Sequence, residues 1–131
     1  MDIIKVLKKA EFAKNIDDST LHKLKQNIEV CHFNKDEIII HQGGKFDSIF
    51  YIYQGSVNVL STPHSSSNQK TQIIAEIGEN CTFGESALFE EEVTATATIS
   101  AKENITLCKI PLIHLKKIKQ NNPELQLPLN I

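Results

Sequence analysis

The feature that most constrains the fold of this chain is a two-residue alternation between residues 93 and 101. Apolar side chains occupy every second position, and three threonines and a serine fill the positions between them. Successive side chains of a β-strand point to opposite faces, so the pattern predicts a strand with a core face and a hydroxyl face. The expected core face consists of Val93, Ala95, Ala97, Ile99 and Ala101.

Short segments with the same period follow one another from residue 29 onward. Turn-forming residues separate them, as at Gly43-Gly44-Lys45, Gln54-Gly55 and Lys102-Glu103-Asn104. Many short strands at intervals of about 8–12 residues are typical of an antiparallel barrel or a double-sheet jelly roll. The expected strands are residues 29–33, 37–41, 48–53, 56–61, 71–77, 94–101 and 106–110.

Helical spacing appears on both sides of this β-rich region. Apolar residues recur at intervals of three and four in segments near residues 2–10 and 18–27, which are therefore expected to be helices. Pro111 is expected to open a last helix over residues 111–120, with lysines crowding its C-terminal end. The predicted fold class is mainly β: an eight-stranded antiparallel jelly-roll barrel with short flanking N- and C-terminal helices.

A chain of 131 residues is the size of one domain, so residues 1–131 are taken as a single domain whose fold covers about 10–120. No internal repeat or second domain is visible. The expected core contains Phe12, Leu24, Phe33, Ile39, Ile49, Tyr51, Val57, Val59, Ile73, Phe83, Leu88, Ala97, Ile99, Leu107 and Leu115.

Charge and composition narrow the set of partners. The formal net charge is −2, which argues against nucleic acid as a partner. No apolar run is long enough to cross a membrane, so no membrane insertion is expected. The three cysteines lie far apart in the sequence, which suits free thiols in a reducing compartment, and the expected location is the cytoplasm. All 14 basic residues other than histidine are lysines, so no guanidinium can hold an anion.

One segment, residues 78–89, interrupts the strand pattern. Gly84 permits a sharp turn, and residues 85–89 suffice for a single helical turn after it. A helix start of this kind directs several N–H groups at one point and favours an anion, while Glu85 can accept hydrogen bonds from sugar hydroxyls. These residues alone also fit a simple connecting turn, so both interpretations stay open at this stage.

Three parts of the chain together resemble the cyclic nucleotide-binding domain family. They are Gly43, the stretch Asp47-Ser48-Ile49-Phe50-Tyr51-Ile52-Tyr53-Gln54-Gly55-Ser56-Val57-Asn58-Val59, and Gly78 with Phe83-Gly84-Glu85-Ser86-Ala87-Leu88. The order and spacing of the glycines match the family, as do the helices before and after the barrel. The resemblance covers roughly residues 10–120, nearly the whole chain.

The resemblance implies a phosphate-binding cassette at residues 83–96. In the family, the glutamate of the Phe-Gly-Glu motif, here Glu85, accepts hydrogen bonds from the ribose 2′-hydroxyl. The backbone N–H groups that follow, here those of Ser86 and Ala87, meet the cyclic phosphate. The predicted ligand-binding residues are Phe83, Gly84, Glu85, Ser86, Ala87, Ala95 and Thr96.

This sequence departs from the family pattern where an arginine pairs with the phosphate, because the alignment places Ala95 at that position. An alignment shifted by one residue places Thr94 or Thr96 there, and neither is a cation. The preceding link is one residue longer than usual and carries three successive glutamates, 90–92. Thr96 follows the arginine position, where members selective for cGMP carry a threonine that contacts the base. Losing an arginine–phosphate pair predicts binding weaker by ~10²-fold or more.

Two hypotheses of function follow. In the first, the chain is a non-catalytic regulatory or sensor module that binds cAMP or cGMP weakly or in an altered way. In the alternative, the same fold is an interaction or scaffold module that has lost ligand binding. The regulated protein partner or effector domain is expected outside this chain. No cofactor, metal site or enzymatic activity is expected, because the five histidines have no metal-ligand spacing and no nucleophile motif is present.

Overall fold

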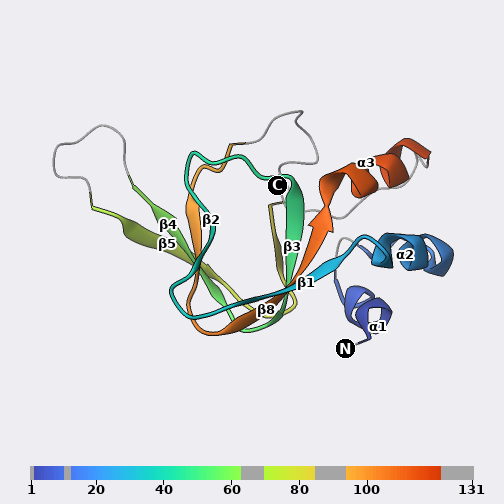
Figure 1. Ribbon diagram of the computed structural model, residues 1–131, viewed down its shortest axis with the longest axis horizontal. Coiled ribbons are helices and arrows are strands. Elements are labelled where there is room, and N and C mark those ends of the chain that lie inside the picture. The colour runs from blue at the N-terminus through green and yellow to red at the C-terminus, as the bar shows by residue number, and fades with distance from the viewer. Residues whose placement is uncertain (1, 11–12, 63–69, 85–93, 122–131) are drawn as a thin grey trace.

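The computed structural model describes residues 2–10, 13–62, 70–84 and 94–121. Within these ranges the chain forms eight strands and three helices (Figure 1). In chain order they are α1 (Ile3–Leu7), α2 (Asp18–Lys25), β1 (Glu29–Phe33), β2 (Ile38–Ile40), β3 (Ser48–Gln54), β4 (Val57–Ser61), β5 (Gln72–Ile77), β6 (Thr82–Phe83), β7 (Thr98–Ala101), β8 (Ile105–Pro111) and α3 (Leu112–Asn121).

The strands form two four-stranded antiparallel sheets, ordered β1-β8-β3-β6 and β2-β7-β4-β5. Strand pairing is nested: the first strand pairs with the last, the second with the seventh, the third with the sixth and the fourth with the fifth. This nesting defines a jelly roll and confirms the predicted fold class. It also brings the two ends of the β-rich region side by side, because β1 and β8 share five registered residue pairs.

The first hydrophobic cluster lies between the two sheets. Strands of both sheets contribute to it, including Ile52 of β3, Val57 of β4 and Leu107 of β8, each with no exposed surface. The remaining buried members are Ile40, Phe50, Phe83, Ile99, Ala101 and Ile105. This cluster is the core that the alternating strands predict.

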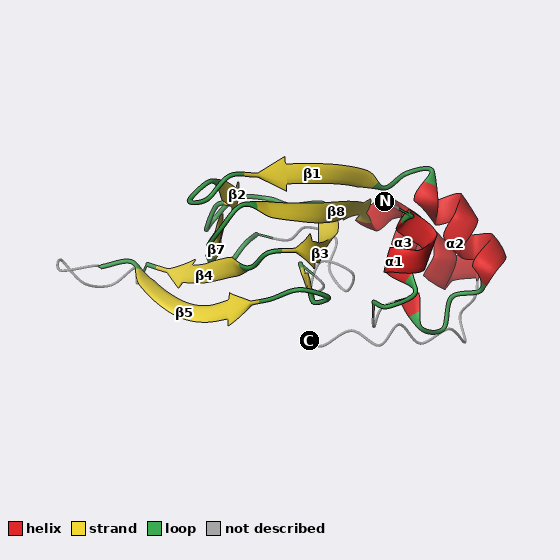
Figure 2. Cartoon of the chain, turned by 90° about the horizontal axis from the view of Figure 1, so that it is seen from below, coloured by secondary structure: helices red, strands yellow, loops and turns green. Residues whose placement is uncertain are grey.

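The second hydrophobic cluster joins the helices to the outer face of the first sheet. Ile49 and Tyr51 of β3 and Cys108 and Ile110 of β8 belong to it, while the alternate residues Phe50, Ile52 and Leu107 belong to the first cluster. The helical members include Leu7, Leu21, Leu24, Leu112 and Leu115. The helices gather at one end of the molecule (Figure 2). The apolar stripes predicted in the helices therefore serve to cover a sheet face.

Most predicted elements are confirmed, with shifts at their ends. The first helix is shorter than residues 2–10, and Pro111 ends β8 and stands just before α3. Strand β6 is not predicted from the sequence, because it lies in the segment 78–89 that interrupts the strand pattern. In the structure this part of the segment pairs with β3. Of the predicted strand at 94–101, only Thr98–Ala101 is a strand. No described residue of 94–101 is helical, in agreement with the alternation.

The predicted core needs one correction. Ile73 is 59% exposed and does not belong to either cluster. Strand β5 lies at the edge of its sheet and pairs only with β4, and residues 72–76 are exposed on both faces, with Ile74 as exposed as Ile73. Isoleucine favours the extended backbone as well as the interior, so its presence in a strand does not by itself require burial.

The other predicted core residues fall into three groups. Leu24, Ile49, Tyr51, Val57, Phe83, Ile99, Leu107 and Leu115 are buried. A second group is half-buried: Phe33, Ile39, Val59 and Ala97. Phe12 and Leu88 lie outside the described residues. On the expected hydroxyl face, Ser100 is buried because β7 lies between β2 and β4 in the sheet. None of the described helices is long and apolar enough to span a membrane.

Two single alanine substitutions in α3, Leu115→Ala and Ile113→Ala, test the packing of the second hydrophobic cluster, called here the helix–sheet cluster. Leu115 has no exposed surface, whereas Ile113 is 59% exposed on the same helix. Leu115→Ala should lower the free energy of unfolding by about 2–5 kcal/mol, because it leaves a cavity. Ile113→Ala should change that free energy by about 0.5 kcal/mol or less. Urea denaturation followed by circular dichroism measures both. Equal losses would show that α3 does not pack as described.

Candidate functional site

A cavity of about 210 Å³ opens between the two sheets. Both ends of the predicted cassette border it, since its walls include Phe83 and Gly84 on one side and Thr94, Ala95 and Thr96 on the other. The remaining lining residues are Ile40, Phe46, Val59, Ile77, Ala97 and Ile99. The described lining is mostly apolar and contains no charged side chain; its side-chain polar groups are the two threonine hydroxyls.

Strand β6 positions the first wall. Phe83 pairs with Phe50 of β3, and their rings stack with centroids 5.0 Å apart and planes inclined by 13°. Phe83 is only 4% exposed. An offset aromatic pair of this kind adds to the stabilisation from burial alone. The residue that begins the cassette is therefore fixed in place by a strand of the core.

A tight turn before β6 is bound to β3. Asn80 adopts a positive φ of 67°, its N–H donates to the Ile52 carbonyl at 2.8 Å, and its Oδ1 accepts from the Tyr51 hydroxyl at 2.7 Å. Burial raises the pKa of that hydroxyl, so it remains a donor. The Glu79 carboxylate accepts from the Gly55 N–H at 3.2 Å. Sequence reasoning identified the turn but missed these supporting residues, because the partners lie more than twenty positions apart.

Gly84 stands where the chain leaves β6. Its φ is +93°, which L side chains rarely adopt. A Cβ atom here would lie 2.9 Å from the Ser48 carbonyl oxygen and 3.3 Å from the Phe46 ring. Glycine is thus required both by the backbone conformation and by the close approach of the neighbouring loop and strand.

The opposite wall is held by the turn that follows β2. The Ala95 N–H donates to the Gly44 carbonyl at 2.8 Å, and the Gly43 N–H donates to the Ala95 carbonyl at 2.8 Å. Thr94 forms an isolated bridge with Lys45. These bonds replace a regular strand, which explains why the N-terminal half of the predicted strand is not one. The side chain of Ala95 is half-buried and packs against the first hydrophobic cluster, between the two sheets.

The structure therefore brings four of the seven predicted site residues together around one cavity: Phe83, Gly84, Ala95 and Thr96. The other three, Glu85, Ser86 and Ala87, lie outside the described residues, as does the single helical turn expected after Gly84. Their predicted contacts with ribose and phosphate stay predictions. Ala95 borders the cavity, and it leaves a methyl group where the family resemblance places an arginine.

In the part of the chain that the structure describes, no group of three His, Cys, Asp or Glu side chains converges. The three cysteines are free. Burial raises the pKa values of the Cys31 and Cys108 thiols, which disfavours the thiolate that a nucleophile or a metal ligand needs.

The nested pairing of the two sheets defines a jelly-roll domain, and comparison with known proteins gives its family. The sequence model of the cyclic nucleotide-binding domain matches residues 30–122, so the chain belongs to that family. The chain is 33% identical to the cAMP-activated global transcriptional regulator CRP of Salmonella typhimurium over 106 residues. That match covers 76% of this chain and 48% of the regulator, so the chain spans about half of its relative.

Solved structures share the fold. The regulatory subunit of a cAMP-independent protein kinase A from Trypanosoma brucei superposes with a TM-score of 0.79 at 19% identity, covering 94% of this chain and 44% of that one. A variant of that subunit with three substitutions, one of them from threonine to arginine, is described as bound to cAMP. It superposes with a TM-score of 0.74 at 18% identity, covering 95% of this chain and 47% of that one.

Replacing Gly84 with alanine tests whether the cavity wall is as tightly packed as described. Gly84→Ala should lower the free energy of unfolding by about 1–3 kcal/mol, because the new Cβ meets the Ser48 carbonyl and the φ is unfavourable. Gly78→Ala is the matched control, since nothing lies within 4 Å of its added Cβ. Thermal unfolding monitored by calorimetry compares the two. A Gly84→Ala protein as stable as the control would contradict this packing.

Proposed function

We propose that this chain is a non-catalytic regulatory or sensor module that binds a cyclic nucleotide weakly or in an altered way. The observation that carries the proposal is the cavity where both ends of the family cassette meet, with a described lining that holds no charge. Family membership supports the ligand class, and the uncharged lining supports weak binding of an anion.

The expected loss of affinity for a cyclic nucleotide follows from the missing arginine–phosphate pair. A hydrogen bond to a charged group contributes about 1.5–3 kcal/mol, and an arginine–phosphate pair makes two when it is bidentate. Removing the pair predicts a loss of ~10²-fold or more in affinity. The chain contains no arginine, and Ala95 has no charge to offer in its place. Lys45 is the candidate substitute cation, because its backbone pairs with Thr94 beside the cavity.

In this proposal the remaining cassette residues keep their family roles. Glu85 accepts hydrogen bonds from the ribose hydroxyl, and the N–H groups of Ser86 and Ala87 meet the phosphate. Thr96 lines the cavity, and in this proposal it contacts the base, as in members selective for cGMP. The Trypanosoma variant described as bound to cAMP carries one introduced arginine among its three substitutions, which agrees with a role for a guanidinium.

An interaction or scaffold module is the second candidate, and the uncharged lining favours it as well. Since the chain spans 48% of the CRP regulator, we propose that the regulated partner or effector lies outside it, with no nucleic acid bound by this domain itself. The three free cysteines suit a cytoplasmic setting.

Isothermal titration with cAMP and cGMP separates the two candidates. The sensor function predicts measurable binding that is weaker than the nanomolar range. No heat at the highest attainable ligand concentration would favour the scaffold function. Nanomolar binding would refute the proposed weakness and point to a substitute cation, and the Lys45→Gln variant would then show whether Lys45 supplies it.

Introducing an arginine at position 95, where the family carries one, tests whether the cavity binds the nucleotide. Ala95→Arg should lower the melting temperature of the free protein, because an unpaired guanidinium is placed in a half-buried position. Cyclic nucleotide should then raise that temperature, since a ligand bound only by the folded state stabilises it. The expected gain in affinity over the parent chain is ~10²-fold.

The control for this gain is the double variant Ala95→Arg with Glu85→Ala, which should lose most of the ligand-dependent shift together with the ribose contact. Two results would count against a nucleotide cavity at the cassette. One is the absence of any shift in the single variant. The other is an equal shift in the double variant, which would locate binding away from Glu85.

A further inference from the structure

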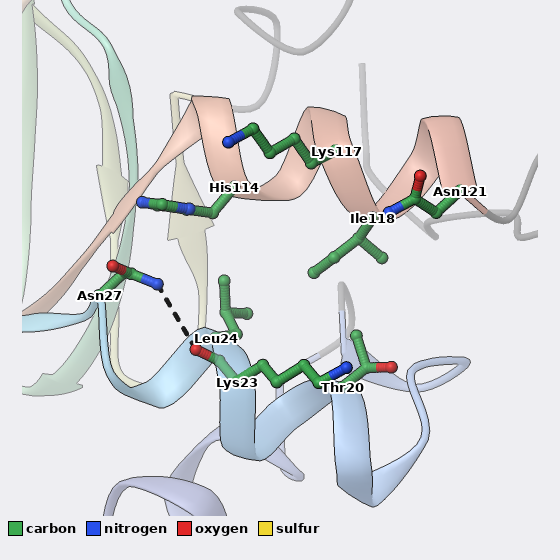
Figure 3. A pocket seen from close by; sticks show the side chains of 8 residues that line it. All are labelled: Thr20, Lys23, Leu24, Asn27, His114, Lys117, Ile118 and Asn121. Atoms are coloured by element: carbon green, nitrogen blue, oxygen red, sulfur yellow. Dashed lines mark hydrogen bonds between the residues drawn. The ribbon is translucent and has the colours of Figure 1, made fainter.

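A second hollow lies between α2 and α3 and shares no lining residue with the cavity of the cassette. It has a volume of about 380 Å³, and its walls come from both helices and the turn after α2 (Figure 3). The polar lining consists of Thr20, Lys23, Asn27, His114, Lys117 and Asn121. We call this hollow the interhelical groove.

The floor of the interhelical groove is apolar. Leu24 from α2 and Ile118 from α3 extend into the space between the two helices (Figure 3). Leu24 is 2% exposed and belongs to the helix–sheet cluster, against which Ile118 also packs. Because Leu24 is almost fully buried, the half-buried Ile118 provides most of the apolar surface that an entering side chain would contact.

The walls of the groove carry positive charge without a compensating carboxylate. Lys23 and Lys117 line it from opposite helices, and no acidic residue is among the described lining residues. Asp18, the acidic residue of α2, forms an ion pair with Lys8 at 3.1 Å. Within the part of the chain that the structure describes, no ion pair is formed by Lys23 or Lys117. The two ammonium groups can thus pair with external carboxylates.

The two helices that form the groove are both basic. Helix α2 carries two lysines and one aspartate, and α3 carries three lysines and no acidic residue, so together they have a formal charge of +4. The whole chain has a net charge of −2. A basic surface on an acidic protein attracts acidic partners and directs them to that surface.

The lining also offers neutral hydrogen-bonding groups. The Asn27 side chain donates one hydrogen bond to the Lys23 carbonyl at 3.4 Å, which leaves its amide oxygen and a second N–H for other partners (Figure 3). Asn121 and Thr20 add an amide and a hydroxyl at the other end of the groove. Groups of this kind suit the carbonyl and N–H groups of a peptide backbone.

We propose that the interhelical groove binds an acidic peptide segment of a partner protein, with an apolar side chain against Ile118 and carboxylates on Lys23 and Lys117. A hollow between two helices accommodates one chain segment, whereas a lipid surface or a nucleic acid duplex meets an open basic face. The apolar contact supplies the anchor, and the charge pairs supply selectivity and orientation.

A displayed library of random linear peptides, selected on the full 131-residue chain, tests this proposal. The selected sequences should be rich in Asp and Glu around one Leu, Ile or Phe. Their affinity for the double variant Lys23→Gln with Lys117→Gln should fall about tenfold, because two charge pairs are lost. Raising the salt concentration should weaken binding to the parent chain and have little effect on the variant.

The matched control is the double variant Lys35→Gln with Lys70→Gln, which removes the same charge from exposed positions outside the groove. It should bind the selected peptides within about twofold of the parent chain. Both double variants should keep the melting temperature of the parent chain, since all four side chains are exposed.

Three results would overturn the proposal. The first is selection without enrichment of acidic residues, or equal binding by both double variants. The second is a large gain in peptide affinity when the chain is shortened to end at Asn121, which would make residues 122–131 the occupant. The third is binding to phosphatidylserine vesicles, lost in the Lys23→Gln, Lys117→Gln variant, with no peptide selected, which would make the partner a membrane surface.

Discussion

The burial of β3 and β8 on both faces is the constraint on which the rest of the structure depends. One face of this strand pair contacts the opposite sheet, and the other contacts the helices. Neither hydrophobic cluster is complete without these strands, so the barrel and the helices are joined through their backbones. A strand covered on both sides needs a continuous apolar run, and β3 provides one in the buried residues 49–52.

Strand β3 also supports the candidate site. Phe50 stacks on Phe83, the Tyr51 hydroxyl and the Ile52 carbonyl fix Asn80, and the Ser48 carbonyl limits Gly84 to a residue without a side chain. A cavity wall attached to the most buried strand has little freedom to shift. In the proposed function, ligand affinity is therefore governed by which groups the cassette carries, more than by the placement of its first two residues.

The sequence predicts the fold well wherever a strand or helix is buried on one face or on both faces. Alternation and turn residues locate the long strands, and helical spacing locates α2 and α3, because both signals depend on local geometry. The predictions are wrong where pairing with a distant segment determines whether residues form a strand. Strand β6 exists because β3 lies beside it, and residues 94–97 leave the strand because Gly43 and Gly44 take up the backbone groups of Ala95. Of the site, the motif gives Phe83, Gly84, Ala95 and Thr96, whereas the support from Tyr51 and Asn80 depends on contacts between distant segments.

The edge position of β5 has a consequence for how the molecule opens. Five of its six residues are exposed, and its backbone is bonded to β4 alone, so separating it from the sheet exposes little additional apolar surface. The free energy of that local opening must be far smaller than the free energy of global unfolding, which requires breaking both hydrophobic clusters. Ile77 at the end of β5 is half-buried, packs against the first hydrophobic cluster and lines the cavity. Opening of β5 would therefore change a wall of the candidate site and remove one contact of the core.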